Sequence, residues 1–431
     1  MENKDILISG ASIAGPALAY WLRSQGFNPT VVERAPALRP GGQTVDLRGA
    51  GRTVIRRMGL MDRARALTLD QRGIAWVNDR GRVTARMPQE MHGGEGIISE
   101  IEILRGDLAG LLYEASQPGT EYLFDDTITG LDQDETGVNV TFEKSVPRRF
   151  GLVIGADGLH SVVRSLAFGP ESGCVRPIGA YMAWFTAAAD ATAEIDLDGW
   201  FLMHNAPGGL VASARPGRRP GEIKAGFSFR SEPITYDRRD LAGQQDLLAR
   251  RFAGVGWEAP RLLAAMRTAP DFFFDSVAQV HLDRWSAGRT ALVGDAGYCP
   301  TPLTGLGTSL ALVGAYVLAG ELAAAAGDHR IAFTRYEQVM RAYVTQAQKL
   351  PPGGLSGYAP MSRAVIRLRD VNMALMTRWP MRLLLAGQFS KAGDIDLPDY
   401  EAARGQVRDR AEAGSGGGAG RSGGLTGDRL Q

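Results

Sequence analysis

The 431-residue sequence predicts an α/β fold in which a Rossmann-like domain is interrupted by an antiparallel sheet and is followed by C-terminal helices. Three observations predict this fold class. The chain opens with a strand, a glycine turn, a helix and a second strand over residues 5–33. Aromatic and methionine residues alternate with polar ones between 176 and 284, as in an antiparallel sheet with a covered face. An apolar strand pattern returns at 290–294, so the chain re-enters the first domain.

These patterns predict a division of the chain into successive segments. They are a first domain (1–175, with a small insertion on the substrate side near 72–98), a substrate domain (176–284), the return of the first domain (285–350), a C-terminal helical segment (351–400) and a tail (401–431). The tail is rich in Gly and Ser from Gly414 onward and cannot bury apolar area, so we expect it to be disordered.

Local patterns predict the individual elements in chain order. Short apolar or alternating runs predict strands at 5–9, 28–33, 44–47, 74–83 (with a turn), 122–124, 138–142 and 152–155. Apolar residues at helical spacing predict helices after residue 10 and at 51–60, from 108, 241–252, 260–266, 307–326, 331–350 and 361–388. The last of these is expected to cover the substrate domain or to form a dimer contact, so a monomer and a homodimer both remain open.

Composition excludes several classes of function. The net charge of +1 gives no reason to expect nucleic acid or an anionic membrane surface as a partner. The two cysteines, Cys174 and Cys299, lie far apart in the sequence, which fits a reducing compartment better than a disulfide framework. The first residues lack the pattern of a secretory signal. We therefore expect a cytoplasmic protein.

The first glycine turn predicts a nucleotide site. Gly10 and Gly15 flank Ser12 between a buried strand and a helix, and Glu33 ends the next strand. A dinucleotide pyrophosphate binds at such a helix N-terminus, and the acid accepts hydrogen bonds from the ribose. An ordinary strand–helix–strand unit with a tight turn is the alternative, and this motif alone does not distinguish NAD from FAD.

Two later motifs favour a flavin. Asp157, in Gly155-Ala-Asp-Gly158, follows an apolar strand, although an Asp-Gly pair there is also common in plain turns. Gly294-Asp295 ends another strand, and a loop with Pro302 and Gly305 leads into a long helix from Gly307. An acid that holds a polyol chain, beside a helix N-terminus that stabilises an anionic ring edge, is what a flavin requires.

With these three motifs in this order, the chain resembles the group A flavoprotein monooxygenases, the aromatic hydroxylases of the p-hydroxybenzoate-hydroxylase type. It is similar to their polyketide-tailoring and tetracycline-inactivating branch. The resemblance covers about residues 4 to 390. It implies a glutathione-reductase-type FAD-binding domain, with FAD as cofactor and NADPH or NADH as a transient reductant.

The resemblance also implies roles for individual residues. The cofactor-binding residues it implies are Gly10, Ser12, Ile13, Ala14, Gly15, Glu33, Arg34, Asp46, Arg105, Asp157, Gly294, Asp295, Pro302, Gly305, Leu306 and Gly307. Arg39 is the residue tied to NADPH, while Pro302 and Gly305 lie beside the isoalloxazine ring. Two positions depart from the family pattern: Ser12 replaces the middle glycine, and Tyr298 replaces a histidine. We expect FAD binding to survive both changes, with altered tuning near the ring.

The function implied is hydroxylation of an aromatic or polyketide-like molecule through a flavin C4a-hydroperoxide, with O2 as co-substrate. Baeyer–Villiger oxygen insertion, a flavin enzyme of other chemistry (a halogenase or an ene reductase), and a flavin-binding redox protein without this activity remain as alternatives. The flavin carries the chemistry, so no catalytic side chain is assigned with certainty and no metal site is expected. His160, His204 and His281 are isolated in the sequence and are expected to be surface or internally paired histidines.

Aromatic and methionine residues of the second domain are candidates for a substrate pocket. They are Met182, Trp184, Phe201, Met203, Phe227 and Phe229. Because alternate residues of a strand face opposite sides, about half of them should instead form core beneath the sheet. The run Phe272-Phe-Phe274 is ambiguous in the same way.

Overall fold

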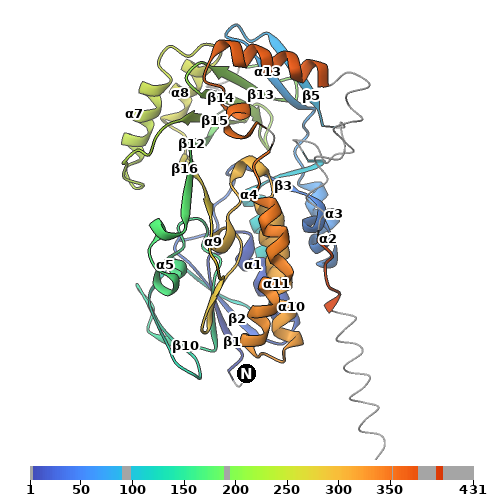
Figure 1. The fold of residues 1–431 in the computed structure, drawn as a ribbon, viewed down its shortest axis with the longest axis vertical. Coiled ribbons are helices and arrows are strands. Elements are labelled where there is room, and N and C mark those ends of the chain that lie inside the picture. The colour runs from blue at the N-terminus through green and yellow to red at the C-terminus, as the bar shows by residue number, and fades with distance from the viewer. Residues whose placement is uncertain (1–2, 90–98, 189–194, 352, 377–394, 401–431) are drawn as a thin grey trace, which may run out of the picture.

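The computed structural model describes residues 3–89, 99–188, 195–351, 353–376 and 395–400. Two lobes lie one above the other in Figure 1, and the long strands β12 (Val175–Ala187) and β16 (Phe273–Val280) run from one toward the other. The lower lobe holds both the beginning of the chain and the segment near residue 290. The predicted α/β fold class is therefore confirmed.

The lower lobe is built on a six-stranded sheet. Its strands, in spatial order, are β17 (Ser286–Ala287), β18 (Thr290–Leu292), β11 (Leu152–Gly155), β1 (Asp5–Ser9), β2 (Asn28–Glu33) and β7 (Glu121–Phe124). All neighbouring pairs are parallel except β17–β18. The strands that carry the three glycine and aspartate motifs are thus immediate neighbours, although their sequence positions differ by up to about 290 residues.

Different layers cover the two faces of this sheet. Ile6 and Ile8 pack into the core formed with helices α1 (Ala14–Ser24), α10 (Gly307–Ala324) and α11 (His329–Ala347). Leu7 points the other way, into a smaller core with β8 (Ile128–Gln133), β9 (Val138–Phe142) and β10 (Arg148–Phe150). The alternation of side chains along one strand therefore supplies both cores. Within the described ranges, α10 is the one helix long and apolar enough to cross a membrane, and 83% of it is buried inside the protein.

The upper lobe contains a seven-stranded sheet. Its order is β16, β12, β15 (Ile223–Arg230), β14 (Leu210–Pro216), β13 (Trp200–Ala206), β4 (Gly73–Val77) and β5 (Val83–Pro88). The sheet was expected to be antiparallel, and all its pairs are except β13–β4, which is parallel. In that pair, β4 comes from a segment more than one hundred residues earlier in the chain than β13. Helices α7 (Leu241–Arg251) and α8 (Ala259–Met266) contribute to the core on one face.

A two-stranded ribbon and several helices complete the fold. They are β3 (Thr44–Leu47), β6 (Ile101–Leu104), α2 (Gly49–Arg57), α3 (Met61–Ala66), α4 (Arg105–Ser116), α5 (Val162–Phe168), α9 (Asp295–Tyr298), α12 (Gly354–Tyr358), α13 (Arg363–Met376) and the 3-10 turns η1 (Glu171–Gly173) and η2 (Pro302–Thr304). The strands that the predictions missed include β5, β6, β8 and β10; in β8 and β10, charged residues interrupt the apolar pattern.

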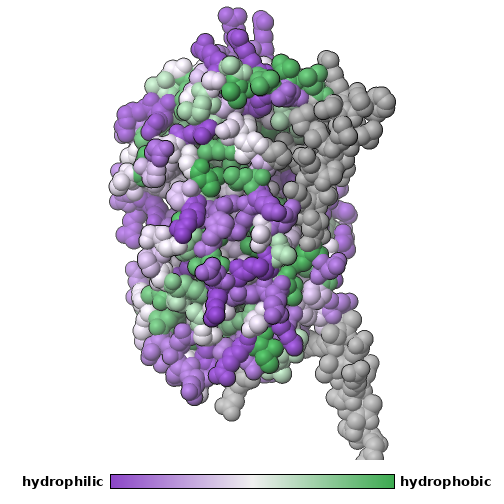
Figure 2. Space-filling view, in the orientation of Figure 1, coloured by the Kyte–Doolittle hydropathy of each residue, from purple (hydrophilic) through white to green (hydrophobic). Residues whose placement is uncertain are grey.

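Helix α13 contacts β5 and β13 of the upper sheet. Its residues Val365, Leu368, Val371 and Leu375 are exposed, and apolar side chains appear at the top of the molecule in Figure 2, where α13 lies. The expected cover over the substrate domain is therefore present within 363–376. The rest of the helix predicted at 361–388, and the tail predicted at 401–431, extend outside the described residues.

Candidate cofactor and substrate site

The motif residues meet at one edge of the parallel sheet. Strands β2, β1, β11 and β18 are consecutive, and at their carboxyl ends lie Glu33, Gly10, Asp157 and Asp295. Ligands of open α/β sheets bind at this edge. The structure thus brings together residues from three separate parts of the sequence. The motifs alone showed only that each of these residues lies at the end of a strand.

The first glycine turn is closely packed. Gly10 has a φ of +104°, and a Cβ on it would lie 2.6 Å from the carbonyl oxygen of Ala156. A Cβ on Gly15 would lie 1.9 Å from the oxygen of Gly10. Both positions therefore require glycine. The following helix, α1, includes Ala14 in its first turn and has Ile13 as its N-cap, so its free N–H groups face the sheet edge.

Ser12 and Glu33 are held in defined positions beside this turn. The Arg105 guanidinium donates a hydrogen bond to the Ser12 hydroxyl at 3.0 Å. The Glu33 carboxylate accepts hydrogen bonds from the backbone N–H groups of Ala11 and Ala35, at 2.8 and 2.9 Å. Ser12 thus contributes a polar contact where the family pattern has a glycine.

Two arginines lie near each other at this end of the site. Burial lowers the pKa of Arg105, the charge of Arg39 lowers it further, and Glu33 opposes both effects. Arg39 itself is exposed, and so is Arg34. A partly desolvated guanidinium with a second cation beside it is suited to bind phosphate groups.

Asp157 organises the turn after β11. One carboxylate oxygen accepts hydrogen bonds from the N–H groups of Val162 and Val163 and from the hydroxyl of Ser9. The other oxygen, Oδ1, is buried and has no hydrogen-bond partner. Burial raises the pKa of this carboxyl, because the charged form has lost its hydration. A ligand hydroxyl or water would satisfy the free oxygen.

Asp295 begins α9, directly after Gly294 at a φ of +66°. Its side chain is exposed to solvent, yet desolvation by the surrounding protein raises its pKa. The carboxylate therefore reaches solvent although the surrounding protein displaces part of its hydration. A Cβ on Gly307 would lie 3.7 Å from its Oδ1, so the N-terminus of α10 lies beside it.

The loop from Pro302 to Gly307, which we call the 302–307 loop, closes this part of the site. Pro302 is exposed, Leu306 is buried, and Gly305 has a φ of +65°. A Cβ on Gly305 would lie 3.0 Å from an oxygen of Asp46. Thr301, just before the loop, has a φ of +84° and a buried hydroxyl without a partner. Such strain in a non-glycine residue is often found at ligand sites.

These features fit FAD. The glycine turn offers backbone N–H groups for a pyrophosphate, Glu33 can accept from a ribose, and Asp295 can accept from a ribityl hydroxyl. The N-terminus of α10 offers positive potential to the ring edge that becomes anionic on reduction. The unpartnered oxygen of Asp157 could also accept a hydrogen bond from a bound ligand or from water.

Tyr298 does not belong to this group. Its ring is 1% exposed and packs against Trp285, with ring centroids 4.7 Å apart. Its hydroxyl lies 2.8 Å from that of Tyr336, which in turn donates to the carbonyl of Leu292. The sequence suggested that Tyr298 would alter the environment of the ring, whereas the structure gives it a role in the core of the lower lobe.

The candidate pocket residues divide between the two faces of the upper sheet. Met182 and Trp184 pack in one small cluster with Leu303 of the 302–307 loop, and Phe201 and Met203 pack in a neighbouring cluster. All four lie on the face opposite the core that α7 and α8 cover; Leu303 places the 302–307 loop against the part with Met182 and Trp184, whereas Met203 packs with Met373 of α13. This face is therefore the candidate substrate surface.

Phe227 and Phe229 require a correction. Both are 0% exposed and belong to the core that α7 and α8 cover on the opposite face. They occupy that face because they alternate with Gly226 and Ser228 along β15. They therefore form core and do not line the pocket. Phe274 joins the same core, whereas Phe273 is exposed on the other side.

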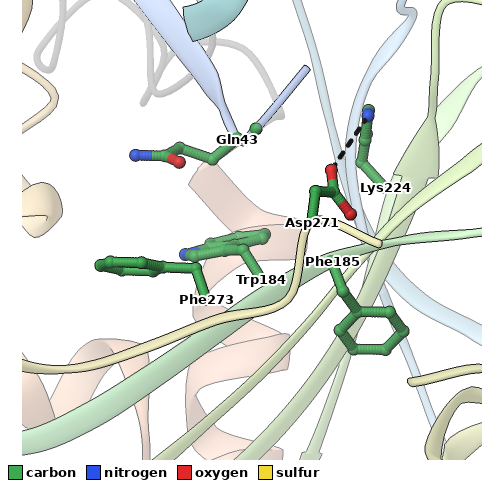
Figure 3. Close-up of a pocket in the computed structure, with 7 residues that line it drawn as sticks. Gln43, Trp184, Phe185, Lys224, Asp271 and Phe273 are labelled. Carbon is green, nitrogen blue, oxygen red and sulfur yellow. Dashed lines mark ion pairs between the residues drawn. The ribbon is translucent and has the colours of Figure 1, made fainter. Parts of the chain in front are cut away.

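Figure 3 shows a recess on the candidate substrate surface. Trp184 and Phe273 lie beside each other on one wall, and the side chain of Gln43 lies opposite them. Lys224 forms an ion pair with Asp271 at 3.8 Å and also contacts the hydroxyl of Thr186. The recess combines flat apolar walls with a few polar groups, and its volume of about 10 Å³ has room for a single water molecule.

Sequence analysis missed several polar residues of the site region. Arg215 of β14 reaches Glu102 of β6, and His160, near Asp157, is held between Glu171 and Asp275 at 2.8 and 2.7 Å. Neither group has a local signal, since their members are far apart in the sequence. The expectation that His160 is an internally paired histidine fits this arrangement.

Comparisons with known proteins agree with the geometry. A family model described as an FAD binding domain matches residues 3–348. An uncharacterized protein of Mycobacterium tuberculosis is 45% identical over 83% of this chain and 95% of its own length. A flavin-dependent monooxygenase of Legionella longbeachae is 39% identical over 81% of this chain and 88% of its own. The crystal structure of the tetracycline destructase Tet(55) superposes with a TM-score of 0.76, at 36% identity, over 92% of this chain and 99% of that one.

The fold and the family match therefore define an FAD-binding flavoprotein, and the carboxyl edge of its parallel sheet is the candidate cofactor site. The chain belongs to the FAD-dependent aromatic monooxygenase family, and it is an FAD-dependent monooxygenase.

Proposed function

We propose that this monooxygenase uses NADPH or NADH and O2 to hydroxylate a bulky aromatic or polyketide-like molecule. When bound and reduced, the flavin supplies the oxygen-transfer chemistry. The chain itself has to bind and orient the flavin, hold the substrate above it and exclude water. No protein nucleophile is needed for these tasks.

The observation that carries the proposal is the contact between the 302–307 loop and the apolar face of the upper sheet. Leu303 of the loop packs in the cluster that includes Met182 and Trp184. Pro302 and Gly305 are the residues proposed to lie beside the flavin ring. A substrate held against Trp184 would therefore lie next to the ring, with Met203 and Phe201 extending the apolar surface.

The size and composition of this surface favour a flat, extended substrate. Aromatic and methionine side chains bind planar ring systems through large apolar contacts and adapt to their shape. The name of one similar structure, a tetracycline destructase, indicates a tetracycline as that protein's substrate. Polycyclic phenols and tetracyclines therefore belong in the first panel of test compounds.

The cations near the glycine turn support a nicotinamide cofactor with an extra phosphate. Arg39 is exposed and its charge is felt by Arg105, so it is free to meet a mobile ligand. We propose Arg39 as the contact for NADPH. Cys174 and Cys299 are both free and buried, which supports a cytoplasmic location as part of the same proposal.

The test is a substrate screen with the FAD-loaded protein. We expect polycyclic phenols to accelerate NADPH oxidation more than small phenols do, and the product to contain one added oxygen atom as a hydroxyl group. If no polycycle surpasses a small phenol, the proposed substrate class is wrong. A ring-expanded lactone or ester product would identify Baeyer–Villiger chemistry instead. NADPH oxidation that yields only peroxide with every compound would favour the alternative of a flavin-binding redox protein that does not hydroxylate.

A matched pair of variants connects the result to the proposed surface. Met182→Ala removes a side chain that packs with Trp184 and Leu303 on the candidate substrate surface, so we expect a raised KM for a polycyclic substrate. Met266→Ala removes a methionine of the same size from the opposite core and should leave the KM unchanged. Equal changes in KM for both variants would show that the substrate binds elsewhere.

A further inference from the structure

A buried polar cluster joins the two lobes next to the 302–307 loop. On the ribbon of β3 and β6, Asp46 and Glu102 are directly opposite each other, so their carboxyl groups lie on the same face. The Arg48 guanidinium lies 3.1 Å from Asp46, and the Arg215 guanidinium contacts Glu102. Two carboxyl groups and two guanidinium groups thus share one small, largely dry space.

Arg215 connects this cluster to the substrate sheet. It comes from β14, donates to Gln71 at 2.7 Å and to Thr44, and its guanidinium lies 4.3 Å from the ring centroid of Phe201. Arg215 is 6% exposed and Glu102 is 4% exposed. Any change in the charge of Glu102 is therefore transmitted to a residue of the substrate surface.

Asp46 connects the same cluster to the cofactor site. Its Oδ2 would be 3.0 Å from a Cβ on Gly305, so the carboxylate lies against the backbone of the 302–307 loop. Its other oxygen accepts a hydrogen bond from the N–H of Ser99 at 3.3 Å. The strand that carries Glu102 continues directly into α4, whose first residue is Arg105.

We propose that Glu102 is a positioning residue, which sets the charge that Asp46 and its neighbours present to the 302–307 loop and so makes FAD binding depend on one proton. Glu102 does not touch the cofactor. It acts through Asp46 on one side and through Arg215 on the other. This inference rests on FAD binding by the chain and is independent of the proposed reductant and substrate.

The charges around Glu102 support this role. Burial raises the pKa of Glu102 to about 7, the facing Asp46 raises it too, and Arg215 lowers it. Helix α3, which also packs on β6, exposes its charged residues to solvent. On α4, Asp107 is paired with Arg218. The charge of the cluster therefore changes near neutral pH, when a proton is added to Glu102.

The direction of the effect follows from charge. With both carboxyl groups ionised, the two carboxylates and two guanidinium groups sum to zero, and protonation of Glu102 makes the cluster positive. FAD carries two negative phosphate charges, and the phosphate side of the site includes Arg105, three residues after Glu102, so FAD binding should be tighter at the lower pH. One proton can change the affinity by at most tenfold per pH unit, and screening reduces this. We expect FAD to bind about three- to tenfold tighter at pH 6 than at pH 8.

The experiment measures the dissociation constant of FAD for the apoprotein across this pH range, from the quenching of flavin fluorescence. In Glu102→Gln, a neutral side chain of the same shape, we expect affinity that is independent of pH and close to that of the unchanged protein at pH 6. Glu321→Gln is the matched control, since Glu321 is equally buried but bonds Tyr400 at the far end of α10. This control should retain the full pH dependence.

Two results would overturn the inference. One is an affinity of the unchanged protein that does not vary between pH 6 and 8, a result that needs no variant to fold. The other is a Glu102→Gln protein that follows the original pH profile. A purely structural role for Glu102 predicts the second result, with weaker binding at every pH and an unaltered slope.

Discussion

The contact between Gly314 and Tyr298 gives a quantitative test of the role assigned to Tyr298. A Cβ on Gly314, in the middle of α10, would lie 2.0 Å from the Tyr298 hydroxyl oxygen and 3.1 Å from a methyl group of Val293. Gly314→Ala should therefore lower the free energy of unfolding by about 1–3 kcal/mol through overpacking. This loss outweighs the gain of about 1 kcal/mol that alanine normally brings to a helix interior.

Tyr298→Phe removes the obstructing oxygen. The Tyr336 hydroxyl keeps its bond to the carbonyl of Leu292 at 3.0 Å, so no buried donor loses its partner. The expected loss is about 0.5–1.5 kcal/mol, the usual value of one hydrogen bond. In the double variant with Gly314→Ala, most of the overpacking disappears. We expect the two changes to be non-additive by about 1–3 kcal/mol, with the double variant more stable than the sum of its parts predicts.

The assay is urea unfolding of the FAD-free proteins, followed by tryptophan fluorescence, to which Trp285, packed on the Tyr298 ring, contributes. Gly110→Ala in α4 is the control, because its Cβ would meet no atom within 4 Å and should stabilise the helix. Additivity within about 0.5 kcal/mol would refute the packing argument. A loss of FAD binding in Tyr298→Phe would refute the assignment of Tyr298 to the core.

Three further variants test the site and the surface. Asp295→Asn should weaken FAD binding about 10- to 100-fold, measured by fluorescence titration, because the acceptor loses its charge. In the FAD-free protein the same change should raise the free energy of unfolding at neutral pH. Desolvation raises the pKa of Asp295 in the folded state above the ordinary value of 3.8. The ionised carboxylate therefore destabilises the fold above that raised pKa, and the protonated group has no such cost well below it. The gain, measured by thermal unfolding, should therefore vanish in acid, and a gain that persists at low pH would contradict this origin. Phe227→Ala should cost about 3–5 kcal/mol of unfolding free energy while the KM of the folded fraction stays unchanged. Trp184→Ala should do the reverse, with a raised KM and little loss of stability, and a KM raised by both changes would mean that the two faces of the sheet were assigned wrongly.

The sequence predicted the elements near the cofactor well because their signals are local. A buried strand, a glycine turn and a helix follow one another within about twenty residues around Gly10, and the same holds for the segment around Asp295. Each motif needs only its own neighbours to form. The strands are parallel, so the loops that carry these motifs lie at one edge of the sheet.

The pocket was harder to predict because strand periodicity does not say which face is covered. Phe227 and Met203 both lie on strands with the expected alternation, yet Phe227 packs under α7 and α8 and Met203 packs on the opposite face of the sheet. That choice depends on where helices from a later part of the chain pack. Arg215 and Glu102 illustrate the same limit, since 113 residues separate two groups that form one ion pair.

The polar groups at the sheet edge show how the fold prepares a binding site at some cost to its own stability. Asp295 is desolvated without being paired to a cation, one oxygen of Asp157 has no partner, and Thr301 holds a strained backbone conformation beside an unsatisfied hydroxyl. Each feature would be unfavourable in an ordinary core. Ligand atoms that complete these hydrogen bonds would remove the cost, so bound FAD should stabilise this lobe by more than its apolar contacts alone would provide. The large, closely packed core formed by α1, α10 and α11 beneath the edge supplies the stability that these groups lack.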